Sequence, residues 1–367
     1  MVGGGTPDTT VKSYWGGDIQ WFTPSEIGKN KYVDFSKRTI TRDGLDNSSA
    51  KLLPLHTILL SSRATVGECS IASNECTTNQ GFQSLIAKQC NIDFLYYLIQ
   101  TKKKDLIRNA CGSTFLEISA NEIRKIKVAV PVQNEQEQIA KLLSLIDERI
   151  ATQNKIIEDL KKLKSAISKY LFARKDLLET TICLSNIATL KNGYAFQSGK
   201  YNALGKWKIL TITNVPGERY INDEDCNCII NLPNDIQDHQ VLKEGDILIS
   251  LTGNVGRVSL CKNGNYLLNQ RVGLLQLAKN VNQEFLYQIL SSQRFENSMI
   301  ACGQGAAQMN IGKGDVENYV LPYSSNGNNI LFAAKILHSY DECIINELRR
   351  LTLLTMQKQY LLTQMFI

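Results

Sequence analysis

Arginine, lysine, aromatic and amide side chains occur together on several stretches that we expect to be loops. Arginine and amide groups suit the edges of bases in the major groove of DNA, and lysines suit phosphates. A single charge of this kind is most often an ordinary solvated surface residue, so only the set as a whole points to nucleic acid. The candidate contacts in the first half of the chain are Lys29, Lys31, Lys37, Arg38, Arg42 and Arg63, beside Trp15, Trp21 and Tyr32. Those in the second half are Lys200, Lys206, Lys208, Arg219, Arg257 and Arg271, beside Tyr194, Tyr201 and Trp207. The run 102–104 of three lysines has no match at 291–293, and it is either a solvated face or a local phosphate contact.

The sequence lacks the short motifs through which common enzyme classes act. It contains no G-x-x-x-x-G-K-[ST], no H-E-x-x-H and no G-x-S-x-G pattern, and none of the patterns that amino-methyltransferases carry. The glycine pairs within 253–256 and 312–314 are more typical of turns than of phosphate cradles. We therefore predict no catalytic residues in this chain.

The composition permits a polyanionic partner without proving one. Forty-one basic residues oppose thirty-five acidic ones, which leaves a net charge of +6. The ten cysteines form no C-x-x-C pair, and His56, His239 and His338 are dispersed, so we expect no metal and buried, reduced thiols. The amino terminus has no signal-peptide features and no long apolar stretch follows, so we expect a soluble, cytoplasmic protein.

The element that must hold these loops in place is a long helix. Residues 134–173 contain no Pro and no Gly, and their apolar side chains recur at alternating intervals of three and four residues. This heptad spacing predicts a helix with a partner helix, and at about 1.5 Å per residue its length is roughly 60 Å. An ordinary core helix, the alternative, averages only about three turns. The predicted seam includes Ile146, Ile150, Gln153, Ile157, Leu160 and Lys164.

The partner helix is in the same chain, because the end of the sequence repeats the pattern. Placing Asp147-Glu148 above Asp341-Glu342 aligns the two helices, and the agreement continues upstream, where 94–96 matches 285–287. The chain is therefore a tandem duplication with a period near 190 residues. The second helix contributes Ile344, Glu347, Leu351, Leu354 and Lys358 to the predicted seam.

We predict that the two helices pair in antiparallel orientation, with the numbers of facing residues summing to about 511. Gln153 then faces Lys358, and Lys164 faces Glu347. A parallel pair would set Lys164 against Lys358, which places like charges in a partly dry seam. Alternatively, both lysines extend out of the seam and fix no register.

Outside the long helices, each copy has the pattern of strands, glycine turns and one helix. We predict strands at 58–61, 128–130, 208–213, 247–250 and 319–321, and helices at 91–109 and 282–300 that are capped by Asn91 and Asn282. The predicted fold class is α+β, with two small mixed α/β domains separated by a pair of long antiparallel helices in a coiled coil, as an internal pseudo-twofold repeat. The predicted divisions are a first domain at 1–131, a long helix at 132–176, a second domain at 177–322 and a long helix at 323–367.

The two copies differ at their starts. The first copy begins almost at the glycine that matches Gly193, so we expect the strand formed by 184–190 to have no equivalent in it. Either the start of the chain is trimmed, or residues 176–181 have no mate because the chain ends at Ile367.

Several stretches together resemble the specificity subunit of type I restriction-modification systems. The resemblance covers nearly the whole chain and departs from the family pattern at the short start. The stretches that carry it are 4–7 with 14–21, then 58–67, 79–82, and Val130-Pro131 leading into 135–140 and 146–150.

The resemblance implies a non-catalytic subunit with two target recognition domains, each reading one half of a bipartite double-stranded DNA target. The long helices would set the spacing and dock two methyltransferase subunits, and with them the restriction subunits. S-adenosylmethionine, ATP and Mg would belong to those partners, with no cofactor in this chain and no membrane. The residues alone leave open a protein-binding scaffold or adaptor that does not read DNA, and a cryptic methyltransferase.

Overall fold

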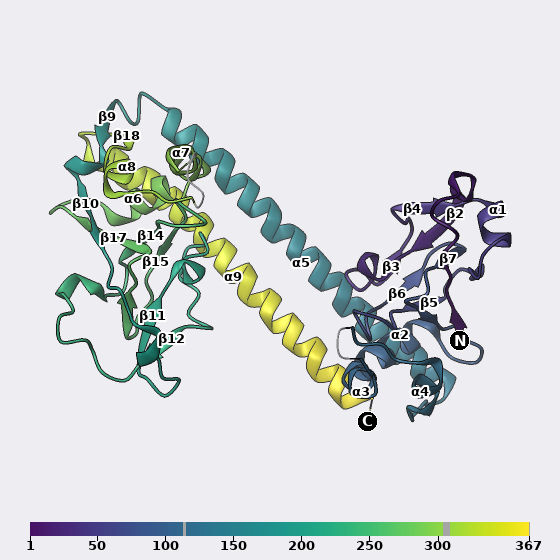
Figure 1. The fold of residues 1–367 in the computed structure, drawn as a ribbon. Coiled ribbons are helices and arrows are strands. Elements are labelled where there is room, and N and C mark those ends of the chain that lie inside the picture. Colours follow the sequence, from purple (N-terminus) through teal and green to yellow (C-terminus); the bar gives the residue numbers. More distant parts are fainter. Residues whose placement is uncertain (113–114, 304–308, 367) are drawn as a thin grey trace. The chain divides into compact units, whose positions relative to one another are not determined.

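The structure is a computed structural model that describes residues 1–112, 115–303 and 309–366. The chain divides into two compact units, Met1–Asn154 with Arg350–Ile367, and Lys155–Arg349 (Figure 1). The boundary between the units falls inside each of two long helices, α5 (Gln133–Ala173) and α9 (Gly327–Met365). The first unit therefore contains the start of α5 and the end of α9, and the second contains the remainder of each.

Both long helices begin and end close to the predicted positions. α5 covers the predicted 134–173 with one additional residue at its start. Charged side chains recur along both helices, and in the described part of the chain no helix is long and apolar enough to cross a membrane. The predicted α+β fold class is confirmed.

In the first unit, a small mixed α/β domain precedes α5 in the sequence. Its strands are β1 (Val2–Gly3), β2 (Trp15–Phe22), β3 (Tyr32–Val33), β4 (Arg38–Ile40), β5 (Ile58–Leu60), β6 (Cys69–Ala72), β7 (Cys76–Thr78) and β8 (Gln83–Ser84). Its helices are α1 (Arg42–Asp46), α2 (Ile92–Thr101), α3 (Lys103–Arg108) and α4 (Ala120–Lys125).

The second unit holds the matching domain between α5 and α9. Its strands are β9 (Thr180–Cys183), β10 (Ala188–Asn192), β11 (Trp207–Leu210), β12 (Asn227–Ile229), β13 (Val241–Leu242), β14 (Ile247–Ser250), β15 (Val258–Leu260), β16 (Tyr266–Leu268), β17 (Val272–Leu277) and β18 (Val320–Tyr323). Its helices are α6 (Gln283–Leu290), α7 (Gln293–Cys302) and α8 (Lys313–Glu317).

Strand pairing shows the duplication directly. In the first unit β2 pairs antiparallel with β4 and parallel with β7, and in the second β11 pairs antiparallel with β12 and parallel with β16. β5 and β6 form an antiparallel pair, as β14 and β15 do. β1 pairs with β8 as β10 pairs with β17, so β1 corresponds to the last two residues of β10, which follow the stretch 184–190. The tandem repeat predicted from the sequence is thus present in the topology.

Each domain packs one helix against the local parts of α5 and α9. In the second unit Phe285 and Ile289 of α6 share a buried core with Leu171 of α5 and with Ala333 and Leu337 of α9. Burying an aliphatic or aromatic side chain of this size stabilises the fold by about 1.5–3 kcal/mol. The domain and the two helix segments therefore form one hydrophobic core.

The first unit repeats this packing. Phe94 and Tyr97 of α2 lie in one core with Leu143 of α5 and Leu362 of α9. Within each unit the segments of α5 and α9 run antiparallel, as predicted, because residues later in α5 share contacts with residues earlier in α9.

The domain helices start where predicted but are interrupted. The Asn91 side chain accepts a hydrogen bond from the Phe94 amide at 3.0 Å, and Asn282 accepts one from Phe285 at 2.8 Å. α2 ends at Thr101, where the Lys102 amide is shared between the carbonyls of Leu98 and Ile99 and the last turn is tightened. In the second domain the Ser292 side chain caps a new helix, α7, so the predicted single helix at 282–300 is divided in two.

Two strand predictions were wrong. Residues 128–130 form no strand, whereas the matching β18 pairs with β9, and the described residues of the first unit include no equivalent of β9. A strand without a partner has unpaired backbone groups and does not form. The strand predicted at 208–213 ends at Leu210, because the Thr211 amide donates to the Asn214 side chain at 2.8 Å and starts a helical turn.

The cysteines are free thiols in different surroundings. Cys69, Cys76 and Cys261 are buried, and burial raises the pKa of each to about 12. Cys111, Cys302 and Cys343 are exposed, so the expectation that the thiols are buried was wrong for these three. Within the described ranges, no group of three or more His, Cys, Asp or Glu side chains is placed to hold a metal ion.

Leu337 provides a test of the shared core in the second unit. It is fully buried on α9, whereas Leu331 on the same helix is well exposed. Leu337→Ala should lower the free energy of unfolding by about 2–5 kcal/mol, because it removes a buried side chain and leaves a cavity. Leu331→Ala should change it by less than about 1 kcal/mol. Denaturant unfolding of the two variants measures the difference, and equal losses would contradict this packing.

Candidate nucleic-acid interface

An exposed arginine lies on two tryptophan rings in the first domain. Arg38 faces Trp21 across the β2–β4 pair, and its guanidinium carbon lies 3.6 Å from the centroid of the Trp15 ring. The two indole rings meet edge to face, with centroids 5.0 Å apart. Such cation–π contacts are worth about 0.5–1 kcal/mol at exposed sites. They orient the guanidinium while the residue stays exposed to solvent.

The second domain carries a comparable basic loop next to β11. Lys200 and Lys206 are both exposed, and the Lys206 ammonium lies 5.9 Å from the centroid of the Trp207 ring. A flexible lysine of this kind suits a phosphate rather than a base edge.

Two exposed apolar side chains were missed by the sequence reasoning. Phe35, in the loop before β4, is 81% exposed, and Leu204, in the loop before β11, is 91% exposed. Each lies within three residues of a candidate basic contact, Lys37 and Arg38 in one case and Lys206 in the other. Apolar groups in a basic loop can contact the methyl group of thymine. An isolated apolar residue in an otherwise polar loop was the signal that could have identified both.

The remaining candidates are solvated or form loose surface pairs. Lys29, Lys37 and Arg271 are exposed, and Arg42 pairs with Asp46 at 3.4 Å on α1. Arg63 lies 3.7 Å from Glu117, and Arg257 lies 3.5 Å from Glu296. Surface pairs of this kind contribute about 0–1 kcal/mol, so their basic members remain able to bind a phosphate.

Three candidates are bonded to carboxylates of their own unit instead. Lys208 donates to Asp223 at 2.7 Å, and Lys262 and Tyr266 bond to the same carboxylate. The bond from Lys208, with those from Lys262 and Tyr266, holds the pKa of Asp223 far below its ordinary value despite partial burial. Lys31 belongs to a larger, partly buried cluster, and Arg219 belongs to a larger buried one. We leave these three residues out of the interface.

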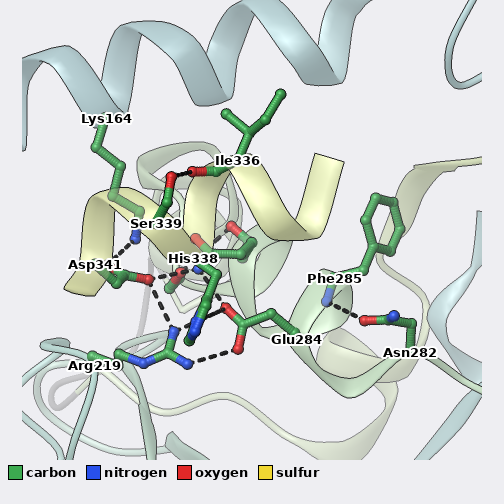
Figure 2. Close-up of polar contacts among 11 residues, drawn as sticks. Lys164, Arg219, Asn282, Glu284, Phe285, Ile336, His338, Ser339 and Asp341 are labelled. Atoms are coloured by element: carbon green, nitrogen blue, oxygen red, sulfur yellow. Dashed lines mark hydrogen bonds and ion pairs between the residues drawn. The ribbon is translucent and has the colours of Figure 1, made fainter. Parts of the chain in front are cut away.

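The cluster in the second unit is centred on Asp341 of α9 (Figure 2). Its Oδ1 accepts from Lys164 Nζ of α5 at 2.6 Å, and its Oδ2 accepts from Arg219 Nη1 at 3.0 Å and from Gln288 Nε2 at 2.6 Å. The side chains of Asp341 and Arg219 are only 7% and 8% exposed. One carboxylate thus joins both long helices to the recognition domain.

Glu284 on α6 completes this cluster. Both terminal nitrogens of Arg219 donate to its carboxylate, at 2.7 and 2.9 Å, and Gln288 donates at 2.7 Å. Burial alone would raise the pKa of Glu284, but the bonds from Arg219 and Gln288 hold it below its ordinary value. His338 Nδ1 lies 3.5 Å from the same carboxylate (Figure 2). Glu284 is therefore held in its ionised form.

The first unit contains an equivalent cluster around Asp147 of α5. Asp147 accepts from Lys358 Nζ of α9 and from the Tyr97 hydroxyl, each at 2.7 Å. Lys31 lies 2.7 Å from Asp93, and it donates to the Tyr97 hydroxyl at 3.3 Å. We call the two groups the anchor clusters: Lys31, Asp93, Asp147 and Lys358 in the first unit, and Lys164, Arg219, Glu284 and Asp341 in the second.

These ion pairs correct the predicted helix register. Lys164 pairs with Asp341, six residues before the expected Glu347, and Lys358 pairs with Asp147, six residues before the expected Gln153. The numbers of facing residues sum to 505 in both units rather than 511. The prediction matched the helices only to each other, whereas each aspartate also bonds to its recognition domain.

The profile of the type I restriction modification DNA specificity domain matches this chain twice, over residues 2–162 and 179–356. These two matches cover most of the sequence and coincide with the repeated topology. The chain therefore belongs to the family of type I restriction modification DNA specificity domains.

Relatives and solved structures agree with this assignment. The MjaIX specificity subunit of Methanocaldococcus jannaschii is 38% identical over 180 residues, which are 47% of this chain and 41% of the relative. The EcoR124I/EcoR124II specificity subunit of Escherichia coli is 28% identical over 184 residues, 48% of this chain and 45% of the relative. The chain thus spans less than half the length of these two relatives in the matched regions.

Two solved structures share the fold over nearly the whole chain. The type I restriction-modification S subunit from M. genitalium superposes with a TM-score of 0.58 at 18% identity, covering 99% of both chains. A chain from a study of complex assembly and conformational transition of the type I R-M system gives 0.62 at 13% identity, covering 99% of this chain and 94% of that one. At these identities the likeness concerns the fold alone.

Proposed function

We propose that this chain is a non-catalytic DNA specificity subunit, in which each recognition domain reads one half of a bipartite double-stranded target. The single observation that carries the proposal is the pairing of the family match with two copies of one domain, each of which presents exposed basic residues. Two readers on one chain suit a target with two separated halves. The proposed domains are residues 1–131 and 177–322, and the proposed helical regions are 132–176 and 323–367.

Base contacts are assigned to the loops around β2, β4 and β11. Arg38 can donate two hydrogen bonds to a guanine, and Phe35 and Leu204 can contact a thymine methyl group or a sugar. Phosphate contacts are assigned to Lys29, Lys37, Arg42, Arg63, Lys200, Lys206, Arg257 and Arg271. This division follows from side-chain chemistry, since lysines position the protein and planar or apolar groups discriminate bases.

The long helices are the proposed spacer and docking surface for partner subunits. Ile156, Leu163 and Tyr170 recur every seven residues on α5 and stay exposed, and Leu353, Met356 and Tyr360 are exposed on α9. Rows of exposed apolar residues are typical of protein interfaces. We assign them to two methyltransferase subunits, which would bring S-adenosylmethionine and Mg, and to restriction subunits that use ATP.

The helices are also the proposed determinant of the gap between half-sites. A helix of about 40 residues is roughly 60 Å long, and one turn of B-DNA is about 34 Å. An unread gap of several base pairs is therefore expected.

DNA affinity of the complex with its partner subunits should fall steeply with salt, because each phosphate contact releases counterions. Lys200→Ala with Lys206→Ala should make the slope of log K against log salt less steep by about 0.9 for each phosphate that is no longer neutralised. Lys162→Ala is the matched control, because this exposed lysine pairs with Glu158 on α5 and is not assigned to DNA. A slope near zero for the unaltered complex would favour a protein-binding adaptor over a DNA reader.

Exchange of the first domain should change one half-site only. We expect a chimera that carries residues 1–130 of a related specificity subunit to keep the second half of the target unchanged, because each domain has its own core and its own loops. Mapping of methylated positions in cells that carry the chimera and the partner subunits measures this. A change in both halves of the target would contradict modular reading.

A further inference from the structure

The two anchor clusters have the same charge arrangement built from different residues. Each consists of two basic and two acidic side chains, one of each from the recognition domain and one of each from the long helices. The helix side is constant, because Asp147 precedes Lys164 and Asp341 precedes Lys358 by seventeen residues in both cases. Each helix therefore supplies its aspartate to one unit and its lysine to the other.

The domain side varies between the two units. The first domain uses Lys31 with Asp93, and the second uses Arg219 with Glu284. A lysine makes a point contact, whereas an arginine binds a carboxylate through two parallel hydrogen bonds. Arg219 bonds directly to Asp341, whereas Lys31 donates to the Tyr97 hydroxyl, which in turn donates to Asp147. The two domains thus reach the helix aspartates in different ways.

Stability alone gives a poor account of the second cluster. In the second cluster the Arg219 Nε, Gln288 Oε1 and His338 Nδ1 atoms are buried without a hydrogen-bond partner among the described residues. Buried ion pairs are often no more stabilising than apolar residues of the same volume. The surrounding core already joins α6 to both helices through apolar contacts. Apolar contacts tolerate small rotations, whereas hydrogen-bonded charges fix direction.

We propose that the anchor clusters fix the orientation of each recognition domain on the long helices, and so determine where along the DNA each half-site is read. Asp147 and Asp341 are positioning residues in this scheme, and they act without touching DNA. The inference rests on the proposed DNA reading. It adds that the spacing between half-sites depends on the Asp147 and Asp341 carboxylates as well as on helix length.

The test compares Asp147→Asn and Asp341→Asn with Glu148→Gln and Glu342→Gln. The two control substitutions remove the same charge from the next residue of each helix, and neither residue belongs to an anchor cluster. Affinity of the complex with its partner subunits is measured on the target, on targets whose gap is longer or shorter by one base pair, and on targets with one base changed in either half-site.

We expect the unaltered complex and both controls to discriminate against the altered gap by about tenfold or more, as for a base mismatch. Each aspartate variant should reduce that discrimination to about threefold or less and keep its discrimination against base changes. Unchanged gap discrimination would overturn the proposal. So would an equal loss on every duplex, which indicates simple destabilisation.

A second measurement needs no DNA and separates this inference from the proposed function. In Asp341→Asn, amide hydrogen exchange should become faster in α6, and in Asp147→Asn it should become faster in α2. In each variant the exchange rates of the other unit should not change, and both control variants should exchange like the unaltered chain. Unchanged exchange rates in the single variants would overturn the proposed anchoring. An unaltered complex that does not bind DNA, together with the expected changes in exchange, would contradict the proposed function alone.

Discussion

A carboxylate on each long helix, buried in Asp341 and partly buried in Asp147, is the constraint on which the arrangement of each unit depends. Asp341 binds Lys164, Arg219 and Gln288 at once, so α5, α9 and the second recognition domain meet at one side chain. Asp147 joins Lys358 and Tyr97 in the first unit. A carboxylate removed from water requires charged partners in fixed directions. These bonds therefore restrict the orientation of each recognition domain relative to the helix segments of its unit.

Apolar packing and charge have different roles around these carboxylates. The cores that contain Phe94 and Phe285 supply most of the favourable free energy, because they remove large aromatic and aliphatic surfaces from water. The ion pairs of the anchor clusters add less net stability than the apolar cores, but they allow few alternative orientations of the domain. This division between apolar packing and charge suits a duplicated chain. The exposed loops of a recognition domain can change while its core and its anchor residues keep the domain in the same position on the helices.

Local and periodic features of the fold could be predicted from the sequence, and long-range pairings could not. The heptad spacing in 134–173, the matching pattern near the end of the chain, and the Asn91 and Asn282 caps depend on neighbouring residues and were confirmed. The register was wrong because Asp147 and Asp341 are paired by residues distant in sequence. Lys31 and Arg219 resemble Lys29 and Arg38 in a sequence, since a basic residue on a loop looks the same whether its partner is DNA or an internal carboxylate. Phe35 and Leu204 were missed because their exposure becomes evident only when the loops are placed.

The most direct test of separate reading by the two units uses photocrosslinking from their exposed apolar side chains. A photoreactive phenylalanine analogue is introduced at Phe35 or at Leu204, and the complex with its partner subunits is irradiated on a defined target duplex. Mapping of the crosslinked nucleotides should place Phe35 in one half-site and Leu204 in the other, with neither in the gap. Crosslinks from both positions to the same half-site, or no crosslink to DNA from either, would contradict the account.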